Sequence, residues 1–450
     1  MLCDGQTEST ATPLRGRTAD WRTAGWRTAG WRTARRRRAV VAVLAVLAVL
    51  ALGIAVVGCG AVSAGQDGGT TSPSHPSHSA ARPAVAGPAS PASPVRSAPP
   101  SCPAAVFGQM TEAQRVGQLF LVGLATDQLD PATAAAIRSD HFGSVLFGTT
   151  GHAGVAGTRA VTNAVQSLAS AQTTAGVRFL VGANEEGGQV QQLQGPGFPA
   201  MPAALDQGLT TPSVLQRQAE AWGRVLRQAG VNLNLAPVMD VVPPGTDQQN
   251  APIGALQRGF GHDPGTVATH GVAFLRGMAQ AGVATTAKHF PGLGRVRGNT
   301  DFSSGVVDTV TAPQDSYLQT YQAAIDAGVP LVMVSLATYT RIDPEHLAVF
   351  STRVMQTTLR QQMHFGGVIV SDDMGAATAV GGVSPAARAI GFLAAGGDMI
   401  TTVSVPVAAE MDRAVLQGAE SNATFRSEIN AAAARVLAVK HVYGLLPCGS

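Results

Sequence analysis

Two adjacent carboxylates, Asp372 and Asp373, follow the apolar residues 367–371. A carboxylate at the end of a buried strand can attack an electrophilic carbon and form a covalent intermediate. A second carboxylic acid with a raised pKa would then protonate the leaving group. The alternative is structural, because an aspartate at this point can cap the helix that follows. We therefore treat Asp372 and Asp373 as candidate catalytic carboxylates, with a helix cap or supporting role as the alternative.

A lysine, a histidine and a Pro-Gly turn form a second polar feature. Residues 288–294 read Lys-His-Phe-Pro-Gly-Leu-Gly and follow an apparent strand at 282–287. Such residues are costly to pack, and they make sense where a loop holds polar groups around a ligand. Lys288 and His289 are therefore candidate binding residues, although a buried core histidine remains the alternative for His289.

The elements that must position these residues alternate regularly along the chain. Apolar, strand-like runs are separated by alanine-rich helical segments, which predicts a parallel α/β sheet. Eight such repeats in about 350 residues predict closure into a (β/α)8 barrel, with its active site at the C-terminal ends of the strands. Strands are expected at 118–122, 144–147, 178–183, 231–235, 285–289, 331–335, 367–371 and 399–402, and helices at 212–229, 264–281, 312–327 and 384–395, among others.

The polar residues follow the ends of these predicted strands, which favours an enzyme. They are Asn184, Glu185, Asp240, Lys288, His289, Asp372 and Asp373. Random surface charge would instead fall on the helices. The net charge of +3 does not indicate a nucleic-acid-binding domain. Only residues 1–38, a basic low-complexity region with repeated Trp-Arg-Thr-Ala, leave nucleic-acid binding as an alternative.

An export signal is predicted at residues 39–59. A run of arginines precedes a long apolar stretch that ends in Gly58 and Cys59. The pattern resembles a lipoprotein signal, in which Cys59 would be acylated and anchor the protein on the outer face of the membrane. An uncleaved signal anchor is the alternative. Both place the rest of the chain outside the cytoplasmic membrane, because the arginines mark the inner side.

Residues 60–101 are rich in proline, serine and alanine, which predicts a flexible tether before a single folded domain at 102–450. Cys102 and Cys448 lie near the two ends of that domain. In an exported protein they are candidates for a disulfide, with two free thiols as the alternative.

Five ordered motifs between residues 111 and 402 together resemble glycoside hydrolase family 3, and specifically its single-domain bacterial β-N-acetylhexosaminidases. The motifs lie at 181–191, 232–241, 257–261, 288–294 and 367–374.

The resemblance implies that Asp372 is the nucleophile of a retaining double displacement. It implies that Arg258, Lys288 and His289 grip hydroxyl and acetamido oxygens of the sugar, with arginine and lysine as fixed donors. Asp240 would contact the sugar, hold Arg258 or cap a loop.

Two positions depart from the family's pattern. Asn184 stands where the family carries an aspartate that contacts sugar hydroxyls, although an amide still hydrogen-bonds hydroxyl groups. Residues 299–301 read Asn-Thr-Asp where the acetylhexosaminidases usually carry Asp-x-His. Asp301 is therefore the candidate acid/base, with Asp308 as a second candidate. The same residues could also form an ordinary polar turn.

The function implied by the resemblance is that of an exo-β-N-acetylglucosaminidase acting on peptidoglycan fragments in the cell envelope. It would bind carbohydrate and, through its lipid, the membrane; it would bind no nucleic acid, need no cofactor or metal, and act as a monomer. Two alternatives remain open. One is another exo-β-glycosidase, such as a β-glucosidase or a phosphorylase, and the other is a non-catalytic sugar-binding lipoprotein.

Overall fold

The computed structural model describes residues 101–124 and 128–448. The predicted basic region 1–38, the signal with Cys59 and most of the tether lie outside the described residues. Among the helices of the described part, none combines the length and apolarity that a membrane crossing needs.

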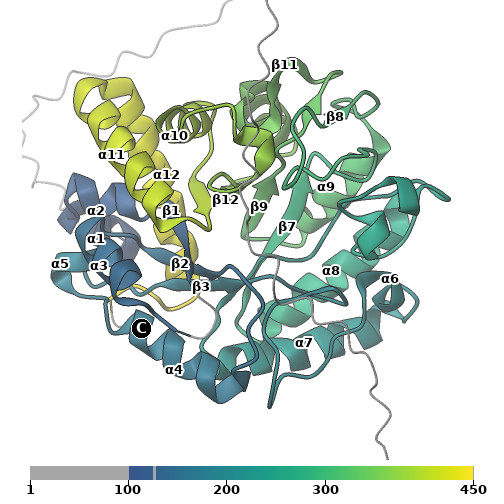
Figure 1. Cartoon of the computed structure of the whole chain (residues 1–450), viewed down its shortest axis with the longest axis horizontal. Coiled ribbons are helices and arrows are strands. Elements are labelled where there is room, and N and C mark those ends of the chain that lie inside the picture. Colours follow the sequence, from purple (N-terminus) through teal and green to yellow (C-terminus); the bar gives the residue numbers. More distant parts are fainter. Residues whose placement is uncertain (1–100, 125–127, 449–450) are drawn as a thin grey trace, which may run out of the picture. The chain divides into compact units, whose positions relative to one another are not determined.

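Eight parallel strands form a closed barrel with the helices arranged around it (Figure 1). The strand order is β1-β13-β12-β9-β7-β6-β3-β2, which confirms the predicted (β/α)8 fold. The strands are β1 (Phe120–Leu124), β2 (Ser144–Phe147), β3 (Leu180–Ala183), β6 (Leu233–Asn234), β7 (Ala284–Phe290), β9 (Leu331–Val334), β12 (Val368–Asp373) and β13 (Met399–Thr402).

The strand register brings the candidate residues to one level. Ser371 of β12 lies opposite Val334 of β9, and Phe290 of β7 lies opposite the same valine. The ends of β7 and β12 are therefore level in the barrel, although β9 separates them. His289 and Asp372, which are far apart in sequence, consequently end at the same face.

The outer helices largely follow the predicted segments. They are α1 (Cys102–Gln109), α2 (Glu112–Gly117), α3 (Pro131–Ser139), α4 (Gly154–Gln166), α5 (Ala171–Thr174), α6 (Ala204–Gln207), α7 (Pro212–Gln228), α8 (Pro264–Gln280), α9 (Gln319–Asp326), α10 (Pro385–Ala394), α11 (Val405–Ser421) and α12 (Ala423–Val442). At the start of α8, the Asp263 side chain accepts a hydrogen bond from the Thr266 backbone, and Pro264 occupies the first turn. This combination caps the helix and fixes its start.

One predicted helix, 312–327, is shorter than expected. It begins with the 3-10 turn η3 (Ser316–Leu318), and α9 starts only at Gln319. The carboxylate of Asp315 accepts a hydrogen bond from the Tyr317 backbone and pairs with Arg295. This cap sets the start of the helical segment, so residues 312–314 stay outside it.

Shorter elements complete the loops above the barrel. The hairpin strands β4 (Glu185–Gly187) and β5 (Val190–Gln191) follow β3, and a small sheet joins β8 (Val307–Asp308), β10 (Thr338–Tyr339) and β11 (Asp343–Leu347). Single-turn helices η1 (Asp247–Gln249), η2 (Gly254–Leu256), η4 (Ala348–Phe350) and η6 (Thr378–Val380) and the π-helix η5 (Arg353–Gln362) lie in other connections.

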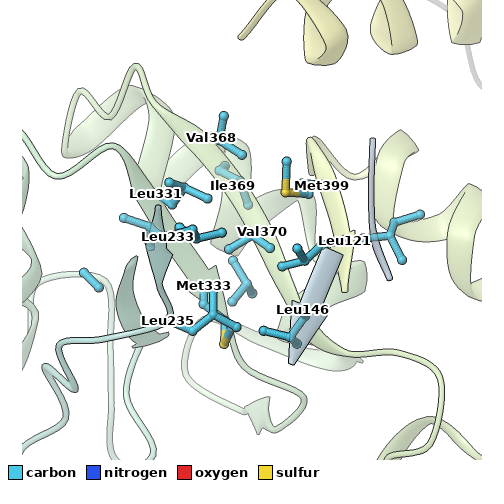
Figure 2. Close-up of a cluster of buried hydrophobic side chains, with 14 of the residues drawn as sticks. Leu121, Leu146, Leu233, Leu235, Leu331, Met333, Val368, Ile369, Val370 and Met399 are labelled. Carbon is cyan, nitrogen blue, oxygen red and sulfur yellow. The ribbon is translucent and has the colours of Figure 1, made fainter. Parts of the chain in front are cut away.

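The core is built from aliphatic side chains of neighbouring strands. Figure 2 shows Leu121, Leu233, Leu331 and Ile369 among the members of this cluster, and each is completely buried. Full burial of one such side chain stabilises the fold by about 1.5–3 kcal/mol. The rigid barrel that results can hold polar loops in fixed positions at its end.

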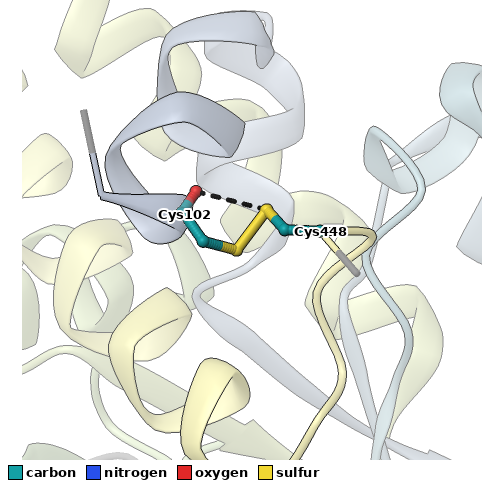
Figure 3. Close-up of a disulfide and its surroundings, with 2 residues drawn as sticks. All are labelled: Cys102 and Cys448. Carbon is teal, nitrogen blue, oxygen red and sulfur yellow. Dashed lines mark hydrogen bonds between the residues drawn. A yellow bond between two sulfur atoms is a disulfide. The ribbon is translucent and has the colours of Figure 1, made fainter. Parts of the chain in front are cut away.

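A disulfide joins Cys102 at the start of α1 to Cys448 near the C-terminus (Figure 3). The two Cα atoms lie 6.0 Å apart across a sequence separation of 346 residues. The structure thus pairs the two cysteines that the sequence marks as disulfide candidates. Such a crosslink restricts the unfolded chain and so stabilises the folded domain.

Candidate active site

A cavity of about 530 Å³ opens at the C-terminal ends of the barrel strands. All the predicted sugar-contacting and catalytic residues line it, except Asp240 and the second acid/base candidate, Asp308. These residues are Asn184, Arg258, Lys288, His289, Asp301 and Asp372. The structure therefore brings together groups that are spread over almost 190 positions of the sequence, as expected of a barrel active site.

Glu186 of β4 holds two cations of the cavity in place. Its carboxylate accepts hydrogen bonds from Arg258 Nε and Nη2 at 2.7 and 2.8 Å, and lies 2.6 Å from Lys288 Nζ. Burial alone would raise the pKa of Glu186, but the charges of Arg258 and Lys288 outweigh it and lower the pKa to about 2. Glu186 is therefore ionised and fixes both cations at the cavity wall.

Asn184 follows β3 directly and extends this cluster. Its amide oxygen accepts a hydrogen bond of 2.8 Å from Lys288 Nζ. An aspartate at this position would add a second negative charge beside Lys288. The neutral amide instead leaves the group of Arg258, Lys288 and Glu186 with one net positive charge. Arg258 and Lys288 also lie close enough to Asp372 to interact with its charge.

Asp240 does not line the cavity, which corrects the expectation that it contacts the sugar. It is fully buried, and its Oδ2 accepts a 2.7 Å hydrogen bond from His289 Nδ1. Its Oδ1 accepts from the Tyr321 hydroxyl at 2.7 Å and from the Leu293 backbone at 2.9 Å. With both oxygens occupied, Asp240 positions His289 rather than a ligand.

The contact with Asp240 also fixes the orientation of His289. Because the carboxylate accepts at Nδ1, that nitrogen carries a proton. The other ring nitrogen, Nε2, lies 3.4 Å from Nη2 of Arg258. His289 is buried yet belongs to the cavity wall, so it differs from an ordinary core histidine.

Asp301 lies in the loop after β7, and that loop is tied to the segment after β12. Backbone nitrogens of Thr378 and Ala379 donate to the carbonyl oxygens of Asp301 and Thr300 at 3.1 Å each. Asn299 accepts a hydrogen bond from the Asp301 backbone at 2.9 Å and thereby shapes the turn. The loop carrying Asp301 is thus anchored beside the strand that carries Asp372.

The environment of Asp301 suits a group that gives and takes a proton. Although the residue is solvent-exposed at the cavity mouth, partial desolvation of its carboxyl and the negative charge of Asp372 raise its pKa to about 6. Asp308, the second candidate, is buried, and its carboxylate accepts from the Val310 and Thr311 backbones at 2.7 and 2.8 Å. It caps a turn and does not line the cavity.

Asp372 and Asp373 have different surroundings despite their adjacency. Asp373 accepts backbone hydrogen bonds from Gly375, Ala376 and Val403 at 2.9 to 3.1 Å, so it caps the turn after β12. Asp372 accepts one, from the Asp373 backbone at 2.9 Å, through Oδ1. Within the described residues its Oδ2 has no hydrogen-bond partner. That oxygen is available for attack on a bound ligand.

The residue that sequence reasoning missed is Glu186. It lies inside the motif at 181–191, in which Asn184 is the predicted sugar contact. Two cations in one pocket need a buried counter-charge. Glu186, an acidic residue beside a glycine pair in the same motif, could have been identified by this requirement. Tyr321, which donates to Asp240, carried no such signal, because it lies in a helical segment among alanines.

Replacing Glu186 with glutamine is expected to destabilise the fold by about 3 kcal/mol or more, because Arg258 and Lys288 lose their buried counter-charge. The folded-state pKa of about 2 is below the ordinary value of 4.5. The contribution of Glu186 is therefore present above pH 4.5 and lost as the pH falls towards about 2. Thermal unfolding of both proteins between these limits measures it.

The matched control for this prediction is Glu220→Gln, which removes a carboxylate from the solvent-exposed pair with Arg224 on α7. Such pairs contribute about 1 kcal/mol or less. Equal effects of the two substitutions would contradict the role assigned to Glu186.

A metal site is not evident in the part of the chain that the structure describes. No group of three or more His, Cys, Asp or Glu side chains there could hold a metal ion.

Comparison with known proteins places this site in a family. The model of the glycosyl hydrolase family 3 N-terminal domain matches residues 111–439. A solved structure of beta-N-acetylhexosaminidase from Beutenbergia cavernae is 46% identical, with a TM-score of 0.73, and the match covers 74% of this chain and 99% of that chain.

Curated relatives of similar sequence are also named as hexosaminidases. A beta-hexosaminidase of Stenotrophomonas maltophilia is 35% identical over 232 residues, which cover 49% of this chain and 66% of the relative. One from Xanthomonas oryzae is 34% identical over 272 residues, which cover 57% of this chain and 77% of the relative. The matched part thus spans slightly under two thirds of the first relative's length. The chain belongs to glycosyl hydrolase family 3 and is, by its family, a glycoside hydrolase.

Proposed function

We propose that this protein is a retaining exo-β-N-acetylglucosaminidase that removes terminal GlcNAc from peptidoglycan-derived fragments. The observation that carries the proposal is the meeting of Asp372 and Asp301 at one cavity, beside the cations held by Glu186. The names of the relatives support the acetylated amino sugar as substrate. The cavity of about 530 Å³ suits a small ligand such as one sugar ring with part of its leaving group.

The reaction proceeds in two displacements at the anomeric carbon. In the first, a carboxylate oxygen of Asp372 bonds to this carbon while the glycosidic bond breaks, and Asp301 gives its proton to the departing oxygen. In the second, ionised Asp301 takes a proton from water. The water oxygen then bonds to the anomeric carbon and releases Asp372.

The neighbouring polar groups bind the sugar and hold it for attack. Arg258 and Lys288 offer charged donors for hydroxyl and acetamido oxygens. Asn184 and His289 add further polar contacts at the same wall. Because Glu186 and Asp240 fix these donors from behind, little reorganisation is required when the substrate binds.

We further propose that the protein is exported and held at the outer face of the cell membrane by a lipid on Cys59. Support comes from the sequence alone, through the arginine run, the apolar stretch and the cysteine that ends it. Globomycin, which blocks removal of lipoprotein signals, should cause a precursor of the full chain to accumulate. Unchanged processing would contradict a lipid on Cys59.

The test of the activity is release of GlcNAc from a GlcNAc-β-1,4-MurNAc disaccharide by the purified full chain. Release that is independent of added phosphate is expected. Turnover of a β-glucoside alone, or only with added phosphate, would instead indicate a β-glucosidase or a phosphorylase. Binding of the disaccharide without turnover would indicate a sugar-binding protein.

Phe302 is expected to contact the leaving-group sugar. It follows Asp301, lines the cavity and is 80% exposed. An aromatic ring in this position can stack on the apolar face of a sugar, for about 0.5–1.5 kcal/mol. Phe302→Ala should therefore lower kcat/KM for the disaccharide roughly three- to tenfold. It should leave kcat/KM for N-acetylglucosaminyl fluoride unchanged, because fluoride is too small to reach the ring.

The control is Leu209→Ala, since Leu209 is 84% exposed and does not line the cavity. It should affect neither substrate. Equal losses on the disaccharide and the fluoride in Phe302→Ala would contradict the proposed contact.

A further inference from the structure

We propose that the opposite end of the barrel carries a second binding site, for a phosphate-type oxyanion, between Arg159, Arg178 and Arg227. These three arginines line a separate cavity of about 240 Å³. Arg178 lies just before β3, and Arg227 lies at the end of α7. The cavity therefore opens at the N-terminal ends of the strands, away from Asp372 and Asp301.

No acidic side chain of the described residues lines this cavity. Arg178 and Arg227 have neither an ion pair nor a side-chain hydrogen bond within residues 101–124 and 128–448. Arg159 donates to the carbonyl oxygens of Arg227 and Gln228 at 3.1 and 3.0 Å, which are neutral acceptors at the end of α7. Arg224, on the same helix, pairs with Glu220 and so has the counter-charge that these three lack.

Two amides of the cavity wall are already engaged and, being neutral, cannot offset the charge of the arginines. The side-chain amides of Gln166 and Asn232 both donate to the Phe179 carbonyl oxygen, at 2.9 and 3.0 Å. Their amide oxygens accept from the backbones of Phe179 and Val181. These contacts brace the wall between α4 and β3, while the guanidinium groups of Arg178 and Arg227 make no side-chain hydrogen bond within the described residues.

The positive charges repel one another. Burial and the neighbouring charges of Arg178 and Arg159 lower the pKa of Arg227. The three side chains are exposed, so solvent screens part of this repulsion. A bound anion would offset the remainder.

The ligand class follows from the charge and the donor geometry. Guanidinium groups match the paired oxygens of phosphate or carboxylate. A phosphate dianion offsets more of the three charges than a monoanionic carboxylate does. Because the cavity is larger than one phosphate ion, it also admits a phosphomonoester.

The test is thermal unfolding of the purified full chain with inorganic phosphate, at constant ionic strength. About 10 mM phosphate should raise Tm by about 2 °C or more. The double variant Arg178→Gln, Arg227→Gln should lose this rise. The control Arg217→Gln removes one positive charge from α7 away from the cavity and should keep this rise. Glycerol 3-phosphate in a second arm distinguishes an ester-linked phosphate from the free ion.

Three results would overturn the proposal. An equal rise in the double variant, or an equal rise of the unmodified protein with acetate, would show that the three-arginine cavity does not select the phosphate group. The third is a double variant that melts below the unmodified protein without phosphate. In that case Arg178 and Arg227 would stabilise the fold by themselves and would not need a counter-ion.

Discussion

Replacing Asp372 with asparagine should reduce kcat for GlcNAc release by roughly 10⁴-fold or more, because the amide cannot form the covalent intermediate. The loss should be of this size even for substrates with good leaving groups, since every substrate must react with the same nucleophile. Substrate binding should persist, because Glu186 still holds Arg258 and Lys288 in place. Steady-state kinetics with the disaccharide and an aryl N-acetylglucosaminide measure the effect.

The neighbouring carboxylate provides the control for Asp372. Asp373 caps the turn after β12 through three backbone hydrogen bonds. Asp373→Asn should therefore lower Tm more than Asp372→Asn does, while retaining more activity. If Asp373→Asn abolished turnover and Asp372→Asn did not, the assignment of the nucleophile would be wrong.

The effect of Asp301→Asn should depend on the leaving group of the substrate. Without the acid, kcat/KM for the disaccharide should fall about 10²- to 10⁴-fold, because the departing sugar oxygen needs a proton. An aryl N-acetylglucosaminide with a good leaving group should still react in the first step. Its second step should become slow, since Asp301 also activates water. A burst of released phenol followed by slow turnover is the expected time course.

The pH dependence gives an independent check on Asp301. The acid must be protonated for the first step, and its pKa is raised to about 6. As the pH rises above about 6, kcat/KM for the disaccharide should fall by up to about tenfold per unit. Asp301→Asn should lose this decline.

Asp308→Asn is the matched control, because Asp308 caps a buried turn outside the cavity. It should keep the decline with pH that the unmodified protein shows. A decline that persisted in Asp301→Asn and vanished in Asp308→Asn would transfer the acid/base role to Asp308.

The barrel and most of the site could be predicted from the sequence because both depend on local patterns. Alternating apolar strands and alanine-rich helices specify the (β/α)8 fold, and polar residues at strand ends specify the active face. The register of β7, β9 and β12 then brings His289 and Asp372 to one level without further information.

The supporting contacts could not be predicted in the same way. Whether Asp240 faces the cavity or lies behind His289 depends on the path of the loop after β6 and on the Tyr321 hydroxyl, which come from distant parts of the chain. The same holds for the start of α9, which a single cap at Asp315 determines. Sequence spacing gives the strand ends but not the partner that each side chain finds there.

The most direct test of the account is mass spectrometry of full-length Asp301→Asn after brief reaction with an aryl N-acetylglucosaminide. We expect one N-acetylhexosamine per chain, attached to the peptide that contains Asp372, and no adduct when Asp372→Asn is added. Consumption of the substrate without any adduct, or an adduct on another residue, would contradict Asp372 as the nucleophile of a retaining glycosidase.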